Sequence, residues 1–399
     1  MSFVDVFNQL DLAEWEDRIE SSTREDVEQV LRSGASGLAV LAPLLSPAAE
    51  ALLESLSLRS QGITRQRFGK VIRMFAPLYL SNECINNCSY CGFSRDNPIL
   101  RVTLSVEETR REAEALVRQG FRNLLLVAGE HPRFVSGGYL KSCLESLRDL
   151  VPGLSLEVGP MEGNEYREMV AAGAEGLVVY QETYDREVYR NMHTAGPKKD
   201  FDWRLETPER AYGAGFRRLG IGALFGLAAW RREAVSVGAH VDYLMRHCWK
   251  SQVTVAFPRL RPCAGEFQPL TSLEDRSLAQ LLAAFRIAFP DVGLVLSTRE
   301  PARLRDGLLP LGVTLMSAGS HTEPGGYTGA GSDKVHRTER GRPQTSFSKM
   351  EHSANGTGPT QATGQFEIAD ERAPREIAEV IRRLGYEPVW KDWDAALTA

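Results

Sequence analysis

Long apolar runs are absent from this sequence, and neither sign of charge is in strong excess. No stretch of about eighteen or more apolar residues, the length that crosses a membrane, occurs in its 399 residues. The first residues, MSFVDVFNQLDLAEWEDRIE, are acidic and lack the apolar centre of a secretory signal. The formal net charge is −5, so we expect neither a nucleic acid nor a membrane as a partner. These absences together predict a cytoplasmic protein.

Cysteine is also scarce. The chain has six cysteines, three of them within eight residues: Cys84, Cys88, Cys91, Cys143, Cys248 and Cys263. A secreted disulfide framework would be denser and would occur in a shorter chain. Cys143 and Cys248 fall in predicted helices, where buried structural thiols are expected, and Cys263 ends a predicted strand. The local group of three therefore indicates metal or redox chemistry.

The middle of the chain alternates short β-prone runs with polar stretches of helical period. Residues 105–120, SVEETRREAEALVRQG, are typical of the predicted amphipathic helices that end in Gly. Eight candidate strands occur at residues 76–82, 123–130, 154–160, 176–183, 218–224, 253–260, 292–298 and 313–319. Strands that alternate with helices predict a parallel sheet, and eight such units in about 250 residues fit an α/β fold of the (β/α)8 TIM-barrel type.

Helical and loop segments flank this predicted barrel, which spans residues 71–320. Residues 1–70 carry apolar residues at helical spacing and predict an N-terminal helical extension. Residues 321–373 are rich in Gly, Ser and Thr, so we expect a long loop whose middle, 329–362, is mobile. Residues 374–399 predict a C-terminal helix and a tail that pack on the barrel. In such barrels the active site forms at the C-terminal ends of the strands.

The cysteine group has the form C-x3-C-x2-C in the segment CINNCSYC, residues 84–91. Three closely spaced thiolates on one loop can ligate three irons of a [4Fe–4S] cluster. No fourth cysteine lies nearby, so one iron would keep an open coordination site for a substrate. The alternatives are a structural zinc site, which normally takes four ligands in two pairs, and a chance group of structural cysteines.

The setting of this motif resembles the radical S-adenosylmethionine (SAM) superfamily. The motif follows the first predicted strand, Tyr90 precedes its third cysteine, and AGEH at residues 128–131 resembles the GGE-type motif of the superfamily. The resemblance implies that Cys84, Cys88 and Cys91 ligate a [4Fe–4S] cluster whose open iron binds SAM. One electron from the cluster then breaks the S–C5′ bond and yields a 5′-deoxyadenosyl radical, while the protein positions and shields the cofactor.

Nine segments, two of which contain the motifs above, occur in order along the chain. They are LYLSNECINNCSYCGFS, LLLVAGEHP, VVYQETY, WRLETPER, IGALFGL, FPRLRPC, LSTRE, PGGY and PVWKDWD. Together they resemble the 2-iminoacetate synthase family, the tyrosine lyases of thiamine thiazole biosynthesis, from about residue 70 onward. The 329–362 segment is longer than the usual loop of that family. The resemblance implies cleavage of the Cα–Cβ bond of L-tyrosine to 2-iminoacetate and p-cresol, with 5′-deoxyadenosine and methionine also formed.

Three other functions compete with tyrosine cleavage. The maturase that makes CO and cyanide for [FeFe]-hydrogenase carries a C-terminal cysteine-bound cluster, whereas no cysteine follows residue 364 here. A tryptophan-cleaving radical SAM lyase shares the core, and only substrate assays separate it. A zinc-stabilised barrel that acts as a non-catalytic binding protein is the alternative of another class. That protein would be colourless, whereas an iron–sulfur protein is brown.

The resemblance also implies a set of residues that bind the cofactor. The candidates are Tyr90, Glu130, Glu157, Glu182, Arg204 and Gly222. Glu130 would receive the amino group of SAM, and Tyr90 would lie along the adenine unless it only packs inside the cysteine loop. Glu157 and Glu182 would bind ribose hydroxyls or a substrate ammonium, and Arg204 the carboxylate of SAM. Either glutamate could instead form an ion pair with Arg204. Gly222, on the fifth predicted strand, would leave room for adenine because it has no side chain.

The substrate needs an anchor for its α-carboxylate, and arginine is the natural bidentate partner. Arg299, at the end of the seventh predicted strand, is the first candidate, with Arg259 and Arg261 in reserve. Ser317 and Ser320 follow the eighth strand and could donate to the same carboxylate. The resemblance implies a thiazole synthase as acceptor of the product, and an electron donor of the flavodoxin or ferredoxin type.

Overall fold

The computed structural model describes residues 2–343 and 361–390. The predicted parallel barrel is confirmed, with eight strands in the order of the chain. They are β1 (Val71–Ser81), β4 (Asn123–Ala128), β5 (Gly153–Glu157), β6 (Gly176–Val178), β8 (Arg218–Gly222), β9 (Gln252–Ala256), β10 (Gly293–Leu296) and β11 (Leu315–Ser317). The barrel closes where Arg73 of β1 pairs with Leu315 of β11. The strands end earlier than predicted, because the polar residues after each strand belong to loops.

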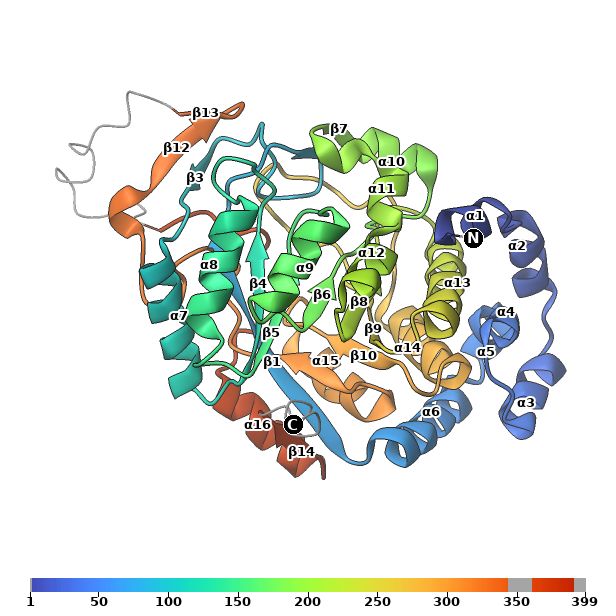
Figure 1. Ribbon diagram of the computed structural model, residues 1–399. Helices are drawn as coiled ribbons and strands as arrows, with labels where there is room; N and C mark the ends of the chain where they lie inside the picture. Colours follow the sequence, from blue (N-terminus) through green and yellow to red (C-terminus); the bar gives the residue numbers. More distant parts are fainter. Residues whose placement is uncertain (1, 344–360, 391–399) are drawn as a thin grey trace.

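Helices surround the barrel on its outside (Figure 1). Those that follow barrel strands are α7 (Val106–Arg118), α8 (Gly137–Leu147), α9 (Gly163–Ala171), α10 (Arg186–Met192), α11 (Phe201–Leu205), α12 (Thr207–Ala214), α13 (Trp230–His247), α14 (Asp275–Ala288) and α15 (Ala302–Leu308). Helix α7 begins at a capping box, in which Ser105 and Glu108 each satisfy a backbone amide of the other. On β1 the alternate residues Ile72, Met74 and Ala76 are fully buried under these helices.

The N-terminal extension consists of short helices that pack against α13 and α14. They are α1 (Phe3–Asn8), α2 (Leu12–Ser21), α3 (Arg24–Ser33), α4 (Leu41–Leu45), α5 (Pro47–Glu50) and α6 (Leu53–Phe68). Phe3 stacks on the ring of His240 with centroids 3.9 Å apart. The buried amide of Gln280 donates to the carbonyls of Leu44 and Ser46 at 3.0 and 2.9 Å. These contacts join the extension to the wall of the barrel.

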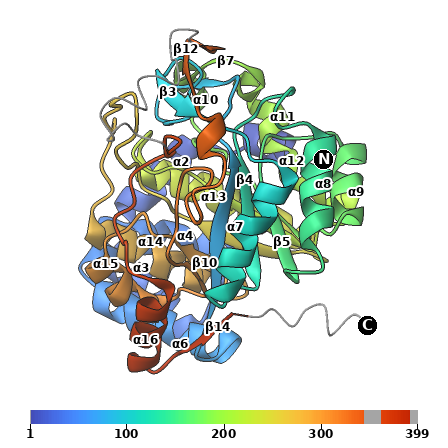
Figure 2. The ribbon, with the colours of Figure 1, turned by 90° about the vertical axis from the view of Figure 1, so that its left-hand side faces the viewer.

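Part of the predicted long loop forms β-structure at the mouth of the barrel. Strands β12 (His336–Glu339) and β13 (Arg342–Pro343) form a sheet with β3 (Ile99–Arg101), which follows the cysteine loop. Figures 1 and 2 both place β3 and β12 at the same end of the molecule. Residues 344–360 lie outside the described residues, so the mobility expected for 329–362 stays a prediction.

The C-terminal segment lies at the opposite end of the molecule, beside the start of β1 (Figure 2). Helix α16 (Pro374–Arg383) is followed by β14 (Glu387–Val389), a ninth strand that pairs in parallel with the start of β1. Sequence analysis did not predict β14. Arg305 and Asp370, both fully buried, form an ion pair that ties α15 to the segment before α16. In the described ranges no helix combines the length and the hydropathy that a membrane span requires.

Candidate active site

The three clustered cysteines lie on the loop that follows β1, at the mouth of the barrel. Cys84, Cys88 and Cys91 are free thiols, and all three line one cavity of about 610 Å³. Glu130, at the end of β4, lines the same cavity. The expected site at the C-terminal ends of the strands is therefore where the cysteine motif is found.

Asn86 holds the cysteine loop in place from inside it. Its side-chain amide donates to Glu130 Oε2 at 2.6 Å, and its side-chain oxygen accepts from the amide of Lys198 at 2.9 Å. Its carbonyl accepts from the amide of Arg95 at 2.9 Å, and the amide of Ile85 donates to the Glu130 carbonyl at 2.8 Å. One asparagine thus fixes the cysteines relative to both β4 and the loop after α10.

The donor set of the cysteine loop fits an iron–sulfur cluster, because cysteine thiolates are the ligands that hold such clusters. The thiols of Cys84, Cys88 and Cys91 all line one cavity. Among the described residues, no group of three or more His, Cys, Asp or Glu side chains is arranged to hold a metal ion. Burial raises the pKa of the Cys84 and Cys88 thiols. A bound cationic centre would oppose this rise, because it stabilises the thiolate form.

Glu182 forms a charged group with two cations at the wall of this cavity. Its carboxylate lies 2.6 Å from Lys198 Nζ and 3.5 Å from the guanidinium of Arg204. Burial alone would raise the pKa of Glu182, but Lys198 and Arg204 outweigh burial and hold the pKa below its usual value. The backbone of Glu182 has φ 72°, a conformation that non-glycine residues rarely adopt and that occurs often at functional sites.

Glu157, at the end of β5, lies between this cavity and a second one. Burial raises the pKa of Glu157 to about 7, although the positive charge of Arg299 opposes the rise. Tyr180 and Val127 line both cavities as well. The two spaces are therefore neighbouring parts of one barrel mouth, and Glu157 is placed where they meet.

The second cavity, of about 720 Å³, contains the predicted carboxylate anchor. Arg299, Ser317 and Ser320 all line it. Ser317 accepts a hydrogen bond from the amide of Thr298 at 3.1 Å, which leaves its hydroxyl hydrogen free to donate. Ser320 Oγ is buried and has no hydrogen-bond partner among the described residues. The structure thus brings together a guanidinium and two hydroxyls that sequence analysis assigned to one task.

The reserve arginines are placed differently. Arg259 Nε donates to both carboxylate oxygens of Glu300 at 3.0 Å, and the guanidinium also lies 2.8 Å from Asp275. Arg261 lines neither of the two mouth cavities. Arg259 is therefore committed to ion pairs, and Arg299 is the anchor candidate that faces the second cavity.

Tyr90 and Gly222 do not line either mouth cavity. The hydroxyl of Tyr90 lies 2.7 Å from His193 Nε2, and the ring packs with Leu224. A Cβ at Gly222 would come within 2.3 Å of the Ala256 carbonyl oxygen, so packing between strands already requires glycine. The adenine contacts expected for both residues stay predictions.

Three residues at the site were missed by sequence analysis. Lys198 follows a short loop with no motif. Gln365 and Phe366 belong to the segment that returns across the mouth after the long loop. Gln365 Nε2 lies 3.7 Å from Cys91 Sγ, and its Oε1 accepts from the hydroxyl of Tyr79 at 2.8 Å. No spacing in the sequence links Gln365 to the cysteine motif.

Comparison with known proteins connects this geometry to characterised relatives. Residues 78–231 match the model of the radical SAM superfamily, and residues 256–387 match that of the biotin and thiamin synthesis associated domain. The chain is 41% identical to 2-iminoacetate synthase of Escherichia coli K12, over 99% of this chain and 98% of that protein. It is 40% identical to the 2-iminoacetate synthase of Salmonella typhimurium over the same shares. The X-ray structure of the FeFe-hydrogenase maturase HydG from Carboxydothermus hydrogenoformans superimposes with a TM-score of 0.81, at 33% identity, and covers 97% of this chain and 85% of that chain.

Proposed function

The chain belongs to the 2-iminoacetate synthase family of radical SAM enzymes, and we propose that it cleaves the Cα–Cβ bond of L-tyrosine. The products are 2-iminoacetate and p-cresol, with 5′-deoxyadenosine and methionine formed from SAM. One observation supports this most strongly. A cavity lined by three cysteines adjoins a second cavity lined by Arg299, and Glu157 lines both cavities.

Cys84, Cys88 and Cys91 hold a [4Fe–4S] cluster, and Glu130 accepts the ammonium group of SAM. When bound, the cluster and SAM supply one-electron cleavage of the S–C5′ bond and a 5′-deoxyadenosyl group that removes hydrogen. Asn86 keeps the Glu130 carboxylate at the cavity wall through a hydrogen bond of 2.6 Å. A carboxylate suits this task because it makes charge-assisted hydrogen bonds with an ammonium.

Lys198 and Arg204 receive the carboxylate of SAM. Both cations line the cysteine cavity, and within the part of the chain that the structure describes Glu182 supplies the one carboxylate in ion-pair contact with them there. The group therefore carries one positive charge in excess, which a second carboxylate neutralises. Burial strengthens this attraction, because fewer waters screen it. Glu182 keeps the two cations in position before the cofactor arrives.

Arg299, Ser317 and Ser320 hold the α-carboxylate of tyrosine. With the carboxylate held there, the amine extends toward Glu157, at the boundary of the two cavities. Glu157 accepts a proton from the substrate ammonium, which a carboxyl with a pKa of about 7 can do near neutral pH. The phenol ring then lies against the apolar walls of the second cavity, which include Phe75. This pose presents the amine, rather than the ring, for hydrogen removal, and near-attack geometry accounts for much of the catalysis.

The balance of the reaction determines which partners are needed. Tyrosine divides into 2-iminoacetate and p-cresol without net loss of atoms, whereas the conversion of SAM to methionine and 5′-deoxyadenosine takes two electrons and one proton. A flavodoxin or ferredoxin type of donor supplies the electrons. The imine hydrolyses in water, so a thiazole synthase is the acceptor that consumes it. Free thiols and an oxygen-sensitive cluster fit a cytoplasmic setting.

An anaerobic assay tests this function. Protein reconstituted with iron and sulfide is incubated with dithionite, SAM and either tyrosine or tryptophan, and the products are read by mass spectrometry. We expect p-cresol and 5′-deoxyadenosine with tyrosine. An indole product formed from tryptophan, with no p-cresol from tyrosine, would move the chain to the tryptophan-cleaving alternative. Colourless protein that binds zinc and forms neither product would support the non-catalytic alternative.

A further inference from the structure

Gln365 connects the cysteine loop to the wall of the second mouth cavity. It lies on the segment that returns across the mouth, and it lines the cavity of the three cysteines. Its Nε2 lies 3.7 Å from Cys91 Sγ, and its Oε1 accepts from the hydroxyl of Tyr79 at 2.8 Å. Tyr79 in turn lines the second mouth cavity. One side chain thus contacts a ligand of the proposed cluster and a residue of the space proposed for tyrosine.

The neighbours of this amide determine which of its ends faces the sulfur. Burial raises the pKa of Tyr79, so the hydroxyl keeps its hydrogen and donates it to Oε1. A cysteine that ligates a metal is a thiolate, and its sulfur can only accept hydrogen bonds. The NH2 group of Gln365, which carries two donors, therefore faces Cys91. The reverse orientation would place a carbonyl oxygen against the thiolate, and two acceptors repel each other.

The backbone around Gln365 keeps the amide in place. Its N–H donates to the Thr322 carbonyl at 3.0 Å, and its carbonyl accepts from the amide of Gly92, which follows the third cysteine, at 3.1 Å. A Cβ at Gly92 would come within 2.5 Å of the Gln365 carbonyl oxygen, so this close approach requires glycine. The Tyr79 ring meets the ring of Phe93 edge to face, with centroids 5.9 Å apart. The donor is therefore positioned by the fold itself, before any cofactor binds.

We propose that Gln365 raises the reduction potential of the cluster through a hydrogen bond from its amide to the sulfur of Cys91. The proposal rests on the [4Fe–4S] cluster proposed for Cys84, Cys88 and Cys91. Reduction adds one electron, which the flavodoxin or ferredoxin type of donor supplies, and no bond forms or breaks. The added electron increases the negative charge on the sulfur ligands, so a hydrogen-bond donor stabilises the reduced state more than the oxidised state. Gln365 therefore makes the cluster easier to reduce.

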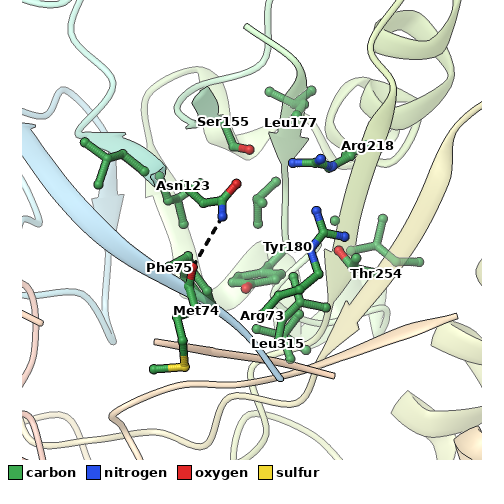
Figure 3. Close-up of a pocket in the computed structure, with 18 residues that line it drawn as sticks. Arg73, Met74, Phe75, Asn123, Ser155, Leu177, Tyr180, Arg218, Thr254 and Leu315 are labelled. Atoms are coloured by element: carbon green, nitrogen blue, oxygen red, sulfur yellow. Dashed lines mark hydrogen bonds between the residues drawn. The ribbon is translucent and has the colours of Figure 1, made fainter. Parts of the chain in front are cut away.

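Solvent exposure also sets the potential of an iron–sulfur cluster, so hydration of the barrel interior is the competing cause of any shift. A third cavity, the floor cavity, has a volume of about 720 Å³ and lies at the end of the barrel where the strands begin. Phe75, Leu125 and Val295 line both the floor cavity and the second mouth cavity. Ser155 lines the floor cavity but neither mouth cavity (Figure 3). A change at Ser155 therefore alters the interior without touching the cysteine loop.

The test is an anaerobic potentiometric titration of reconstituted full-length protein without SAM, in which electron paramagnetic resonance follows the reduced cluster. Gln365→Leu removes the donor, so the equilibrium constant for reduction should fall about tenfold, which is about 59 mV for one electron. Gln365→Glu keeps the shape but places a carboxylate oxygen against the sulfur, so the fall should be larger. Tyr79→Phe lets the amide turn, so the fall should be smaller, and it should add little in the Gln365→Leu background.

Two matched controls should keep the wild-type potential. Gln361→Leu removes another amide from the same returning segment, where Gln361 Nε2 donates to Glu323 at 2.9 Å rather than to a sulfur. Ser155→Ala changes a polar group of the floor cavity. Equal potentials in the wild type, Gln365→Leu and Gln365→Glu would overturn the proposal. A control that shifts as far as Gln365→Leu would also overturn it, in favour of hydration or general disturbance of the segment.

Iron and sulfide analysis of each protein separates this proposal from the proposed function. A wild type that holds no cluster after reconstitution would overturn both. A cluster present at equal potential in every variant would overturn only the role of Gln365. If Gln365→Leu loses the cluster, Gln365→Glu and Tyr79→Phe decide the question by the same order of potentials, because both keep the volume of the side chain that they replace.

Discussion

The guanidinium of Arg299 lies 3.4 Å from the centre of the Phe366 ring. Arg299 follows β10 inside the barrel, whereas Phe366 belongs to the segment that returns across the mouth after the long loop. A stacked guanidinium keeps its planar fork in one orientation while its edge stays available for a carboxylate. The segment around Phe366 therefore sets the geometry of the proposed substrate anchor.

Replacing Arg299 with Lys should weaken tyrosine binding without loss of the cluster. Lysine cannot make a bidentate contact, and a charged hydrogen bond contributes about 1.5–3 kcal/mol, so KM should rise about tenfold to a hundredfold. Steady-state p-cresol formation gives KM, and iron analysis gives cluster content. An unchanged KM would remove Arg299 from the anchor.

Replacing Phe366 with Leu should raise KM for tyrosine by a smaller factor. The lost cation–π contact contributes about 0.5–2 kcal/mol, and its loss lets the Arg299 guanidinium turn. In the Arg299→Lys background the same change should have little further effect, because the two residues act as one unit. Additive effects in this double-mutant cycle would show that Phe366 acts independently of Arg299.

Arg259 offers a contrast to Arg299. Arg259→Gln should lower stability by about 3–5 kcal/mol, because the Glu300 side chain, only 4% exposed, loses its partner. KM for tyrosine should stay near the wild-type value below the unfolding temperature. Thermal unfolding and p-cresol kinetics measure the two effects separately. A large rise in KM with unchanged stability would reverse the roles assigned to Arg259 and Arg299.

Replacing any one of the three cysteines with Ala should abolish the [4Fe–4S] cluster, because the two thiolates that remain are too few to hold it. The three variants are Cys84→Ala, Cys88→Ala and Cys91→Ala. Cys263→Ala is the matched control, since Cys263 Sγ lies near the loop, 3.3 Å from the Tyr90 carbonyl. Iron and sulfide analysis and the brown absorbance of reconstituted protein give the readout. Loss of the cluster in the Cys263 variant would mean that Cys263 is a fourth ligand.

Tyrosine cleavage should depend on pH through Glu157. Burial raises the pKa of Glu157 to about 7, so the carboxylate that accepts a proton from the substrate is lost below that pH. The value of kcat/KM should therefore rise with pH through about 7, and Glu157→Gln should lower activity and remove this limb. The stability of the folded state depends on pH in the opposite direction to activity, because burial in the folded state favours the neutral form of Glu157. Stability should fall as pH rises through about 7, and this fall should be smaller in Glu157→Gln.

The sequence predicted the eight barrel strands because their apolar runs alternate with helical periods. It placed the start of β1 too late, at residue 76, because Arg73 interrupts the apolar run VIRMF. In the structure Arg73 faces the floor cavity, where a charged side chain is accommodated. Strand β14 was missed because it has three residues and contains Pro388, which suits only an edge strand.

The site was predicted where residues carry chemistry in a local pattern. The cysteine motif and Glu130 both follow strands that the alternation of β-prone and helical segments predicts, and they line one cavity. Gln365 could not be found in this way, because it lies 274 residues from Cys91 and reaches it only through the folded path of the chain. Lys198 was missed for a related reason, since its partner Glu182 adopts a positive φ that no sequence pattern reveals.

The most direct test of the account is the fate of the amine hydrogen of tyrosine. The reconstituted wild-type protein is incubated anaerobically in D2O with SAM, a reductant and unlabelled tyrosine, so that the amine carries deuterium while the carbons carry hydrogen. We expect p-cresol together with 5′-deoxyadenosine that contains one deuterium. Unlabelled 5′-deoxyadenosine formed alongside p-cresol, or 5′-deoxyadenosine formed with no p-cresol at all, would contradict it.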